Sequence, residues 1–262
     1  REPGGVSMLD ALRDAGARVL LPITVTDAAG APLPLLWAEY RTGELVRARY
    51  GLLEPAGPAL PAETIALAAG EARALSFVNA GVREISVRLE AGASLGLHVL
   101  NAAPGYGRFA LRAELAEGAR FNFGAAQLAG SGQVLEVVTE VAHLGRDAVS
   151  RQVVRSVAGG GSTVNYLGKV HVAKGADGTD GEQSVRAMLL DRQSAANARP
   201  ELEIHADDVK CAHGCAVGEL DANALFYMAQ RGLPPETAKR LMLQAFVAEA
   251  FVGAADAEAL NE

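Results

Sequence analysis

The 262-residue sequence has few aromatic residues, two cysteines and no long apolar segment. Aromatic side chains make up 5% of the residues, so the core must be built from small and β-branched side chains, which suit closely stacked strands or closely packed helices. No run of about 18 apolar residues is present, so no segment is predicted to span a membrane. The two cysteines, Cys211 and Cys215, are too few for a disulfide framework and favour a reducing compartment.

Positive charge is also scarce. The chain has 24 Lys and Arg against 31 Asp and Glu, which gives a net charge of −7. No cluster of Lys and Arg is available to neutralise phosphates, so we expect no nucleic-acid partner. The first residues, Arg1–Gly5, lack the charged-then-apolar pattern of a secretory signal. These features together predict a cytoplasmic protein with neither nucleic acid nor membrane as a partner.

Residues 1–69 have the pattern of an α/β segment. A short helix is expected after Ser7, followed by a strand at Val19–Val25 and another at Leu35–Ala38. A stretch rich in Pro and Gly then runs to Pro61 and is predicted to be a loop.

From about residue 71 the sequence alternates between short strand-like runs and glycine turns. The predicted strands are Val82–Leu89, Phe109–Leu115, Val134–Val141, Gln152–Val157 and Val164–Val172. No helix-period segment interrupts them until Asp221, a predicted N-cap, after which two helices are expected, the second opening at Pro234–Glu236. Repeated strands without helices predict a mainly β fold, and the pattern alone fits a sandwich and a solenoid about equally.

The densest group of chemically active residues is His205–Cys215. In an extended strand, Cys211, His213 and Cys215 project to one face, and thiolate and imidazole are ligands that zinc and iron–sulfur species prefer. These three are therefore candidate metal ligands. The alternative is that the cysteines are small buried side chains and His213 is structural. A closed zinc site is disfavoured because four ligands at finger spacing are absent, and a hydrolytic Cys–His pair lacks a readable orienting partner.

The remaining histidines carry weaker signals. His98 and His143 lie beside strand residues and are predicted to be structural. His171 alternates with apolar residues and is predicted to face solvent.

The C-terminal two-thirds of the chain, about residues 75–250, resembles the SufB/SufD family of iron–sulfur cluster assembly proteins. The segments that carry the resemblance are Gly168–Val172, Thr179–Ser184, Ala187–Leu190, Arg199–Gly214, Val217–Asp221, Ala224–Tyr227 and Arg231–Leu233. The variant is SufD-like, because the stretch after the cysteine reads Cys211-Ala212-His213-Gly214.

This resemblance implies a right-handed parallel β-helix over residues 70–216 and a helical segment over residues 217–262. It implies a non-enzymatic scaffold that acts with a SufB-like subunit and a SufC-like ATPase, and that forms a homodimer when the SufB-like subunit is absent. His213 falls on the family's functional histidine and Cys211 on its neighbouring cysteine, whereas Cys215 stands where many members have a small residue. No stably bound cofactor is implied, only a transient iron–sulfur cluster or iron at the partner interface.

Residues 8–68 resemble a different family, the 5-formyltetrahydrofolate cyclo-ligases. The matching pieces are Leu9–Leu12, Gly16–Pro22, Trp37–Tyr40 and Gly51–Pro58. The basic segment that precedes these pieces in the ligases is missing, and so is the later glycine-rich segment of the nucleotide site. Residues 1–69 are therefore interpreted as an incomplete ligase-like segment, without cyclo-ligase activity because catalysis needs the whole set of groups in place. A small metal-binding β-protein using Cys211, His213 and Cys215 is the third hypothesis.

Overall fold

The computed structural model describes residues 63–254 throughout and, before them, the backbone of five short strands. The chain divides into two compact units, Arg1–Pro61 and Ala62–Glu262. In the first unit, three strands form an antiparallel sheet and two more form an antiparallel pair. The sheet contains β1 (Arg18–Leu20), β2 (Thr24–Thr26) and β3 (Pro32–Leu33), and the pair contains β4 (Leu35–Arg41) and β5 (Glu44–Tyr50).

Two sequence predictions fall on the described strands of the first unit. The single strand predicted over Val19–Val25 is wrong, because this stretch contributes to two antiparallel strands in which Leu20 pairs with Thr24. Pro22, between them, has no N–H to donate to a continuous ladder. The strand predicted at Leu35–Ala38 is confirmed as the start of β4. The helix predicted after Ser7 and the loop predicted up to Pro61 lie outside the described residues.

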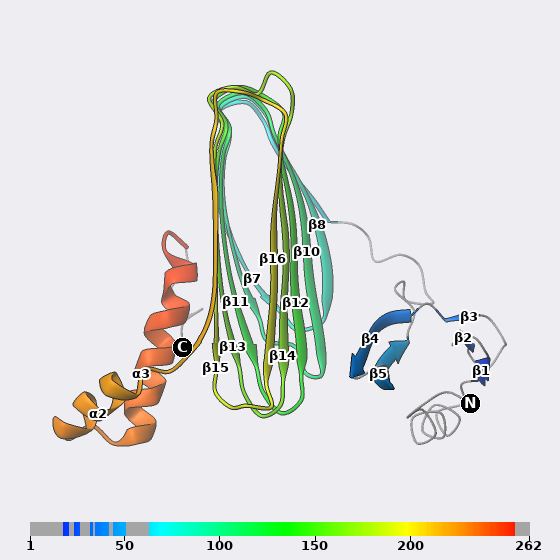
Figure 1. Cartoon of the computed structure of the whole chain (residues 1–262). Helices are drawn as coiled ribbons and strands as arrows, with labels where there is room; N and C mark the ends of the chain where they lie inside the picture. Colours follow the sequence, from blue (N-terminus) through cyan, green and yellow to red (C-terminus); the bar gives the residue numbers. More distant parts are fainter. Residues whose placement is uncertain are drawn as a thin grey trace. The chain divides into compact units, whose positions relative to one another are not determined.

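The second unit is a parallel β-solenoid made of two six-stranded sheets. Figure 1 shows the two sheets face to face, with the chain passing from one to the other at each turn. The first sheet contains β6 (Glu63–Leu67), β8 (Val82–Leu89), β10 (Tyr106–Leu115), β12 (Val134–His143), β14 (Thr163–Val172) and β16 (Ala195–Ile204). The second contains β7 (Ala72–Asn79), β9 (Ser94–Asn101), β11 (Arg120–Ala129), β13 (Val149–Ala158), β15 (Asp180–Leu189) and β17 (Lys210–Glu219).

The parallel pairing decides between the two architectures that the sequence left open. Every pair of neighbouring strands in the solenoid is parallel, as in the pairing of Tyr106 with Val134 and of Val134 with Thr163. A β-sandwich would instead pair its strands antiparallel. The predicted parallel β-helix with C-terminal helices is therefore confirmed, and its first strand, β6, begins at Glu63.

Glycine turns stack on one another along one edge of the solenoid. Gly92 has a φ of +68° and its N–H donates to the carbonyl of Glu117 in the next coil at 2.8 Å. Gly118 repeats this conformation, with a φ of +67°, and donates to the carbonyl of Arg146 at 2.8 Å. Because L-residues rarely adopt positive φ, the predicted glycine turns allow each corner to bond to the corner of the next coil.

The hydrophobic core lies between the two sheets. Alternate residues of each strand point inward, so that Leu95, Leu97, Phe109 and Phe123 are almost completely buried. The rings of Phe109 and Phe123 stack with their centroids 6.1 Å apart. Burying one side chain of this size contributes roughly 1.5–3 kcal/mol, so the alternation supplies much of the stability of the solenoid.

The C-terminal segment is helical, as predicted. It contains α2 (Ala222–Gln230), α3 (Pro235–Ala248) and the 3-10 helix η1 (Glu249–Phe251). Asp221 caps α2, since its carboxylate accepts a hydrogen bond from the backbone N–H of Asn223 at 2.8 Å. Gly232, with a φ of +84°, follows the end of that helix. Within residues 63–254, neither helix has the length and apolar character that crossing a bilayer requires.

η1 packs on the outer face of the second sheet, beside β11 and β13 (Figure 1). A Cβ atom built on Gly124 would lie 1.7 Å from the carbonyl oxygen of Ala250, so the close approach of η1 requires glycine at this position. Arg155 is 4% exposed and donates from Nε and Nη2 to the carboxylate of Glu249, at 2.8 and 2.7 Å. The helical segment is therefore held to the solenoid by steric fit and by an ion pair between the buried Arg155 and the half-exposed Glu249.

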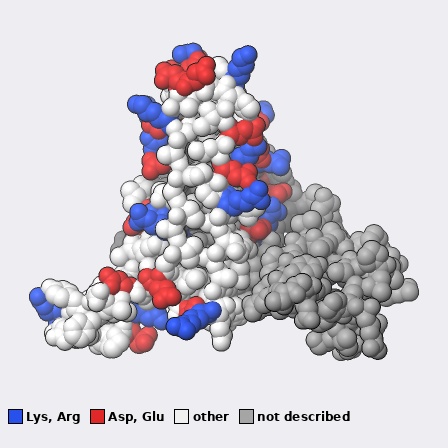
Figure 2. Space-filling model, in the orientation of Figure 1, with Lys and Arg blue, Asp and Glu red and all other residues white. Residues whose placement is uncertain are grey.

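The outer faces of the sheets carry mixed charge. Figure 2 shows acidic and basic side chains interspersed on the visible face. They pair between neighbouring strands, for example Arg88 with Glu114 at 3.1 Å and Arg108 with Glu136 at 3.0 Å. A solvent-exposed pair such as Arg88–Glu114 contributes at most about 1 kcal/mol, so it supports the register of the strands more than the stability of the fold.

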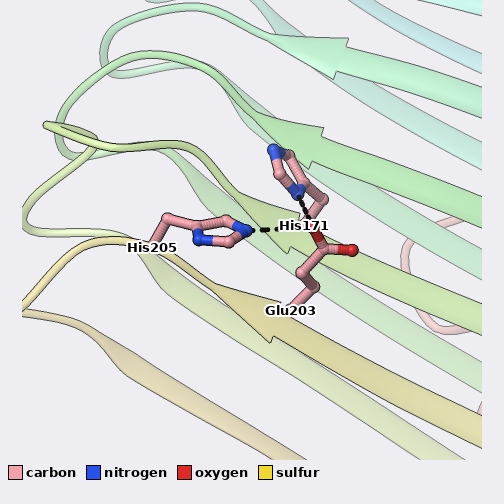
Figure 3. Close-up of side chains that lie close together, drawn as sticks. All are labelled: His171, Glu203 and His205. Atoms are coloured by element: carbon pink, nitrogen blue, oxygen red, sulfur yellow. Dashed lines mark hydrogen bonds and ion pairs between the residues drawn. The ribbon is translucent and has the colours of Figure 1, made fainter.

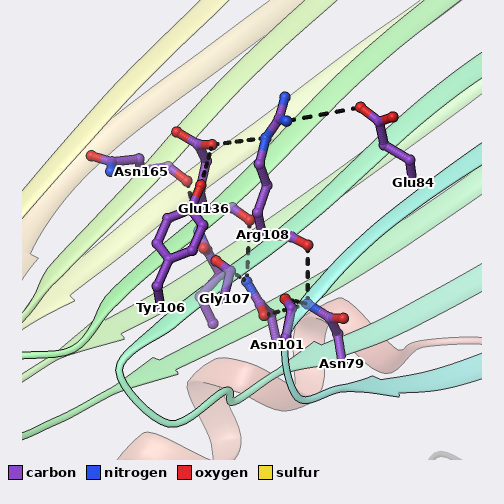
Figure 4. A network of polar contacts seen from close by, with 10 residues as sticks. Asn79, Glu84, Asn101, Tyr106, Gly107, Arg108, Glu136 and Asn165 are labelled. Carbon is purple, nitrogen blue, oxygen red and sulfur yellow. Dashed lines mark hydrogen bonds and ion pairs between the residues drawn. The ribbon is translucent and has the colours of Figure 1, made fainter. Parts of the chain in front are cut away.

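A buried amide ladder lies below the Arg108 pair. Figure 4 shows Asn79 and Asn101 at equivalent positions of neighbouring coils. Asn79 Nδ2 donates to Asn101 Oδ1 at 2.9 Å and to the carbonyl of Gly81 at 2.9 Å. Asn101 Nδ2 donates to the carbonyl of Glu136 at 3.2 Å. The two amides thus satisfy backbone groups at the turns and link three successive coils.

Candidate functional site

The Cys211–Cys215 segment forms the first half of β17, the last strand of the second sheet. Cys211, His213 and Cys215 pair in register with Gly181, Gln183 and Val185 of β15. The three β15 residues are buried inside the solenoid. The prediction that the two cysteines and the histidine share one face of a strand is confirmed, and that face continues the inner face of the sheet.

These side chains nevertheless remain accessible, because β17 is the edge strand of its sheet. His213 and Cys215 are exposed, and Cys211 is partly buried. Because β17 is the last strand of its sheet, backbone groups along its outer edge have no neighbouring strand to pair with. Its inward-facing side chains are also left uncovered, since no further coil follows among the described residues. This combination is suited to pairing with a strand from another chain.

Cys211 lies beside Gly181 of the preceding coil. A Cβ atom built on Gly181 would lie 3.5 Å from Cys211 Sγ, 3.5 Å from Val170 Cγ1 and 3.7 Å from His143 Nε2, so the thiol, an apolar side chain and a buried imidazole all surround this glycine. Burial raises the pKa of the Cys211 thiol, the charge of Asp180 acts in the same direction, and contact with the backbone of Gly181 opposes both. The thiol is therefore protonated at neutral pH, and binding of a metal ion would have to displace its proton.

A buried chain of polar side chains leads to the position below His213. Thr139 Oγ1 donates to Gln152 Oε1 at 2.8 Å and lies 3.0 Å from the hydroxyl of Tyr166. Gln183 Nε2 donates to the same hydroxyl at 3.3 Å. Burial raises the pKa of Tyr166 to about 12, so its hydroxyl stays protonated and can donate. Gln183 is the register neighbour of His213. This row of polar side chains therefore ends on β15, one strand before the imidazole of His213.

Sequence reasoning missed this polar chain. The available signal was the presence of polar side chains at inward positions of strands that are otherwise apolar, such as Thr139 on β12 and Gln183 on β15. Gly168 was a second signal, because a Cβ atom there would lie 2.0 Å from the Tyr166 hydroxyl. A glycine inside a strand often marks such a close approach.

The remaining histidines lie in two kinds of environment. His98 and His143 are buried, 3% and 0% exposed, in agreement with their predicted structural role. His143 Nε2 lies 2.9 Å from Ser150 Oγ, and burial lowers the pKa of this imidazole to about 4. His171 is on the outer face of β14 with 28% of its side chain exposed, as predicted.

The three candidate metal ligands of β17 are spaced along one strand. Alternate residues of a strand lie about 6.6 Å apart, so Cys211 and Cys215 are about 13 Å apart and the three residues cannot all bind one ion. Among residues 63–254, one group of three possible ligands has all its ligand atoms within 4.8 Å of one another, and it contains His171, Glu203 and His205 instead.

Comparison with known proteins connects this architecture to iron–sulfur cluster assembly. The family model for the SufBD core domain of the SUF system of FeS cluster assembly matches residues 76–246. The iron–sulfur cluster assembly protein SufD of Escherichia coli is 35% identical over 100 residues, which are 38% of this chain and 24% of that protein. The chloroplastic protein ABCI7 of Arabidopsis thaliana is 40% identical over 84 residues, 32% of this chain and 18% of that protein.

A separate similarity involves a ligase. The 5-formyltetrahydrofolate cyclo-ligase of Mycolicibacterium smegmatis is 51% identical over 92 residues, which are 35% of this chain and 45% of the ligase. The chain thus spans less than half the length of each of these curated relatives.

Proposed function

The chain belongs to the SufBD family of iron–sulfur cluster assembly proteins, and we propose that it acts as a SufD-like scaffold subunit, without catalytic activity of its own. The observation that carries this proposal is the family match over residues 76–246, which include most of the solenoid and α3 up to Phe246. The edge strand β17 lies within this matched region and presents Cys211 and His213 to an incoming partner.

The chemistry of β17 favours a site that two chains share. Imidazole and thiolate are both ligands for iron species, and a neutral imidazole can also accept a proton from a nearby thiol. Cys211 and His213 cannot complete a coordination sphere from one strand, so the other ligands must come from the partner. We therefore propose that a transient iron–sulfur cluster or iron ion is held between Cys211, His213 and groups of a SufB-like subunit. Cys215 is about 13 Å along the strand from Cys211, so it would bind only a separate ion.

The partners follow from the open edges and from the family. β16 and β17 both end their sheets, so a SufB-like subunit can add strands to each of them. A SufC-like ATPase completes the proposed complex. In the absence of the SufB-like subunit, the same edges would pair with a second copy of this chain and form a homodimer.

His213→Ala is the variant that tests the proposed role of this residue. His213 is exposed, so the free energy of unfolding should change by no more than roughly 0.5–1 kcal/mol. Cluster formation by the complex of this chain with SufB-like and SufC-like subunits should fall sharply while the complex still assembles. Ala212→Ser, on the opposite face of β17, is the matched control and should leave cluster formation unchanged. Normal cluster formation by His213→Ala, or a loss of several kcal/mol in stability, would show that the histidine is structural.

The identity of 51% to a cyclo-ligase identifies a second candidate function. We propose that the chain lacks this activity, because the match covers 45% of the ligase and an active site requires all of its groups together. An assay of ATP-dependent conversion of 5-formyltetrahydrofolate by the full chain tests this, and measurable turnover would reverse the conclusion.

A further inference from the structure

Two imidazoles and a carboxylate converge on the outer face of the first sheet. His171 is the penultimate residue of β14, Glu203 is the penultimate residue of β16, and His205 follows the end of β16. Figure 3 shows both rings directed at the carboxylate of Glu203. His205 Nε2 lies 2.9 Å from Glu203 Oε1, and His171 Nδ1 lies 3.5 Å from the same oxygen. We propose that His171, Glu203 and His205 form a binding site for a divalent transition-metal ion.

The separations of the three ligand atoms fit such an ion. Zinc binds imidazole nitrogen and carboxylate oxygen at about 2.0–2.2 Å, so neighbouring ligand atoms around it lie roughly 2.9–3.5 Å apart. The two separations to Glu203 Oε1 fall in this range, and all three atoms lie within 4.8 Å of one another. The imidazole rings are tilted by 57° with their centroids 5.5 Å apart, so they do not stack and their nitrogens can meet at one point.

The backbone holds the three residues in place. His171 and Glu203 are register partners in the parallel ladder of β14 and β16. The backbone N–H of His205 donates to the carbonyl of Val172 at 2.9 Å, which fixes the chain just after β16. Little rearrangement is then needed before binding, and preorganisation of this kind favours affinity.

The charged groups around the site leave one oxygen of Glu203 facing the two imidazoles. Lys169 forms an ion pair with Glu203 through Oε2, which leaves Oε1 directed at the two imidazoles. Glu140 and Glu201 also act on Lys169, but each of these carboxylates pairs with an arginine, Arg112 at 3.3 Å and Arg199 at 2.7 Å, so the surrounding charges are balanced. On binding, the ion would replace the contacts of His205 Nε2 and His171 Nδ1 with Glu203 Oε1, and the proton that either nitrogen donates to this oxygen would move to the other nitrogen of the same ring or to solvent.

The ligand set defines the class of metal. Two imidazoles and one carboxylate suit Zn²⁺, Co²⁺, Ni²⁺ and Fe²⁺, whereas Mg²⁺ and Ca²⁺ prefer sites made of oxygen. Three protein ligands leave coordination positions open for water or for another molecule. The side chains are 28%, 41% and 54% exposed for His171, Glu203 and His205, so a bound ion can exchange with solvent.

This proposed site is separate from the edge strand proposed for cluster assembly. His171 and Glu203 lie on the outer face of the first sheet, whereas Cys211 and His213 lie on the inner face of the second. The two proposals can therefore fail independently, and one experiment can distinguish their ligands. Co²⁺ bound by nitrogen and oxygen shows d–d absorption without the sulfur charge-transfer band that a cysteine ligand produces.

The test is titration of the tag-free, full-length chain with Zn²⁺ by calorimetry and with Co²⁺ by visible absorption. One ion should bind per chain, without a sulfur charge-transfer band. At other metal sites, removing a residue that only hydrogen-bonds to a ligand weakens metal affinity about 10–100-fold. His171→Ala and His205→Ala each remove a ligand itself, so each should weaken metal affinity at least as much. Glu114→Gln, on the same outer face but two strands away from β14 and paired with Arg88, and Cys211→Ser should keep the affinity of the parent chain.

Three results would overturn the proposal. One is the absence of stoichiometric binding in the parent chain, which would mean that the three residues form a hydrogen-bonded surface cluster only. Another is unchanged affinity in the double variant His171→Ala/His205→Ala. The third is a sulfur charge-transfer band that disappears in Cys211→Ser, which would place the ion on β17. Circular dichroism of each variant checks that the solenoid is intact.

Discussion

A fully buried histidine lies in the interior of the solenoid and makes its stability sensitive to acid. His143 is 0% exposed and its Nε2 lies 2.9 Å from Ser150 Oγ. Burial lowers the pKa of His143 to about 4, although contact with the backbone of Ala148 and the charge of Asp180 both act to raise it. In the unfolded chain the same imidazole titrates near 6.5. The unfolded state therefore binds this proton first as the pH falls.

The sign and size of the effect follow from this difference. Because the folded pKa is the lower one, the contribution of His143 to stability is fully present above about pH 6.5 and is lost as the pH falls toward 4. One pKa unit corresponds to about 1.4 kcal/mol, so the whole shift is worth about 3 kcal/mol. About 2 kcal/mol of this should be lost between pH 7 and pH 5.

The assay is urea unfolding followed by far-ultraviolet circular dichroism at pH 7, 6 and 5. Fluorescence is unsuitable, since the single tryptophan, Trp37, lies in the first unit and not in the solenoid. His143→Gln does not titrate and can still bond to Ser150, so its stability should fall less steeply with acid. The comparison also cancels the effect of His98, whose pKa burial lowers in both proteins. Equal losses in the parent and the variant would refute the assignment of this acid sensitivity to His143.

Two further predictions concern the attachment of the helical segment. Glu249→Ala leaves the charge of Arg155 buried without its partner and should cost about 3 kcal/mol, the lower end of the range for broken buried pairs because Glu249 is half-exposed; unchanged urea unfolding would contradict this. Gly124→Ala should displace η1, because the new Cβ would collide with the carbonyl of Ala250, and amide hydrogen exchange at Ala250 should rise. Gly96→Ala is the control, since its Cβ would meet nothing closer than 3.7 Å, and equal exchange in the two variants would disprove the steric argument.

The strands of the solenoid could be predicted from the sequence, but their pairing could not. The strand predicted at Val82–Leu89 coincides with β8, because inward apolar and outward polar residues alternate along it. The same alternation occurs in antiparallel sandwiches, so it contains no information on which strands are neighbours. From the sequence, only the resemblance to a known family favoured a solenoid over a sandwich.

The candidate sites show the same limit. The parity of Cys211, His213 and Cys215 could be predicted, because it depends on a single strand. The proximity of His171 to Glu203 and His205 could not, because it depends on which residue of the following coil is the register partner of His171. Coil lengths differ, as the turns between strands differ in length, so a fixed repeat would not have revealed this partner. The polar chain through Tyr166 escaped prediction for the same reason.

The last coil shows why the edge strand is better interpreted as an interface than as a simple end. In the two preceding coils, the positions equivalent to His213 are occupied by Gln152 and Gln183, and both are buried by the strand that follows. His213 carries the same type of side chain, polar and directed inward, yet β17 is exposed along almost its whole length. Solenoids normally protect such an end with a capping segment, but among residues 63–254 the helical segment packs mainly against β11 and β13, away from this edge. The last coil therefore has the inward-facing side chains of a covered coil, although no described residue covers it. Such a coil would allow another subunit to continue both sheets. That subunit would then contact Cys211 and His213.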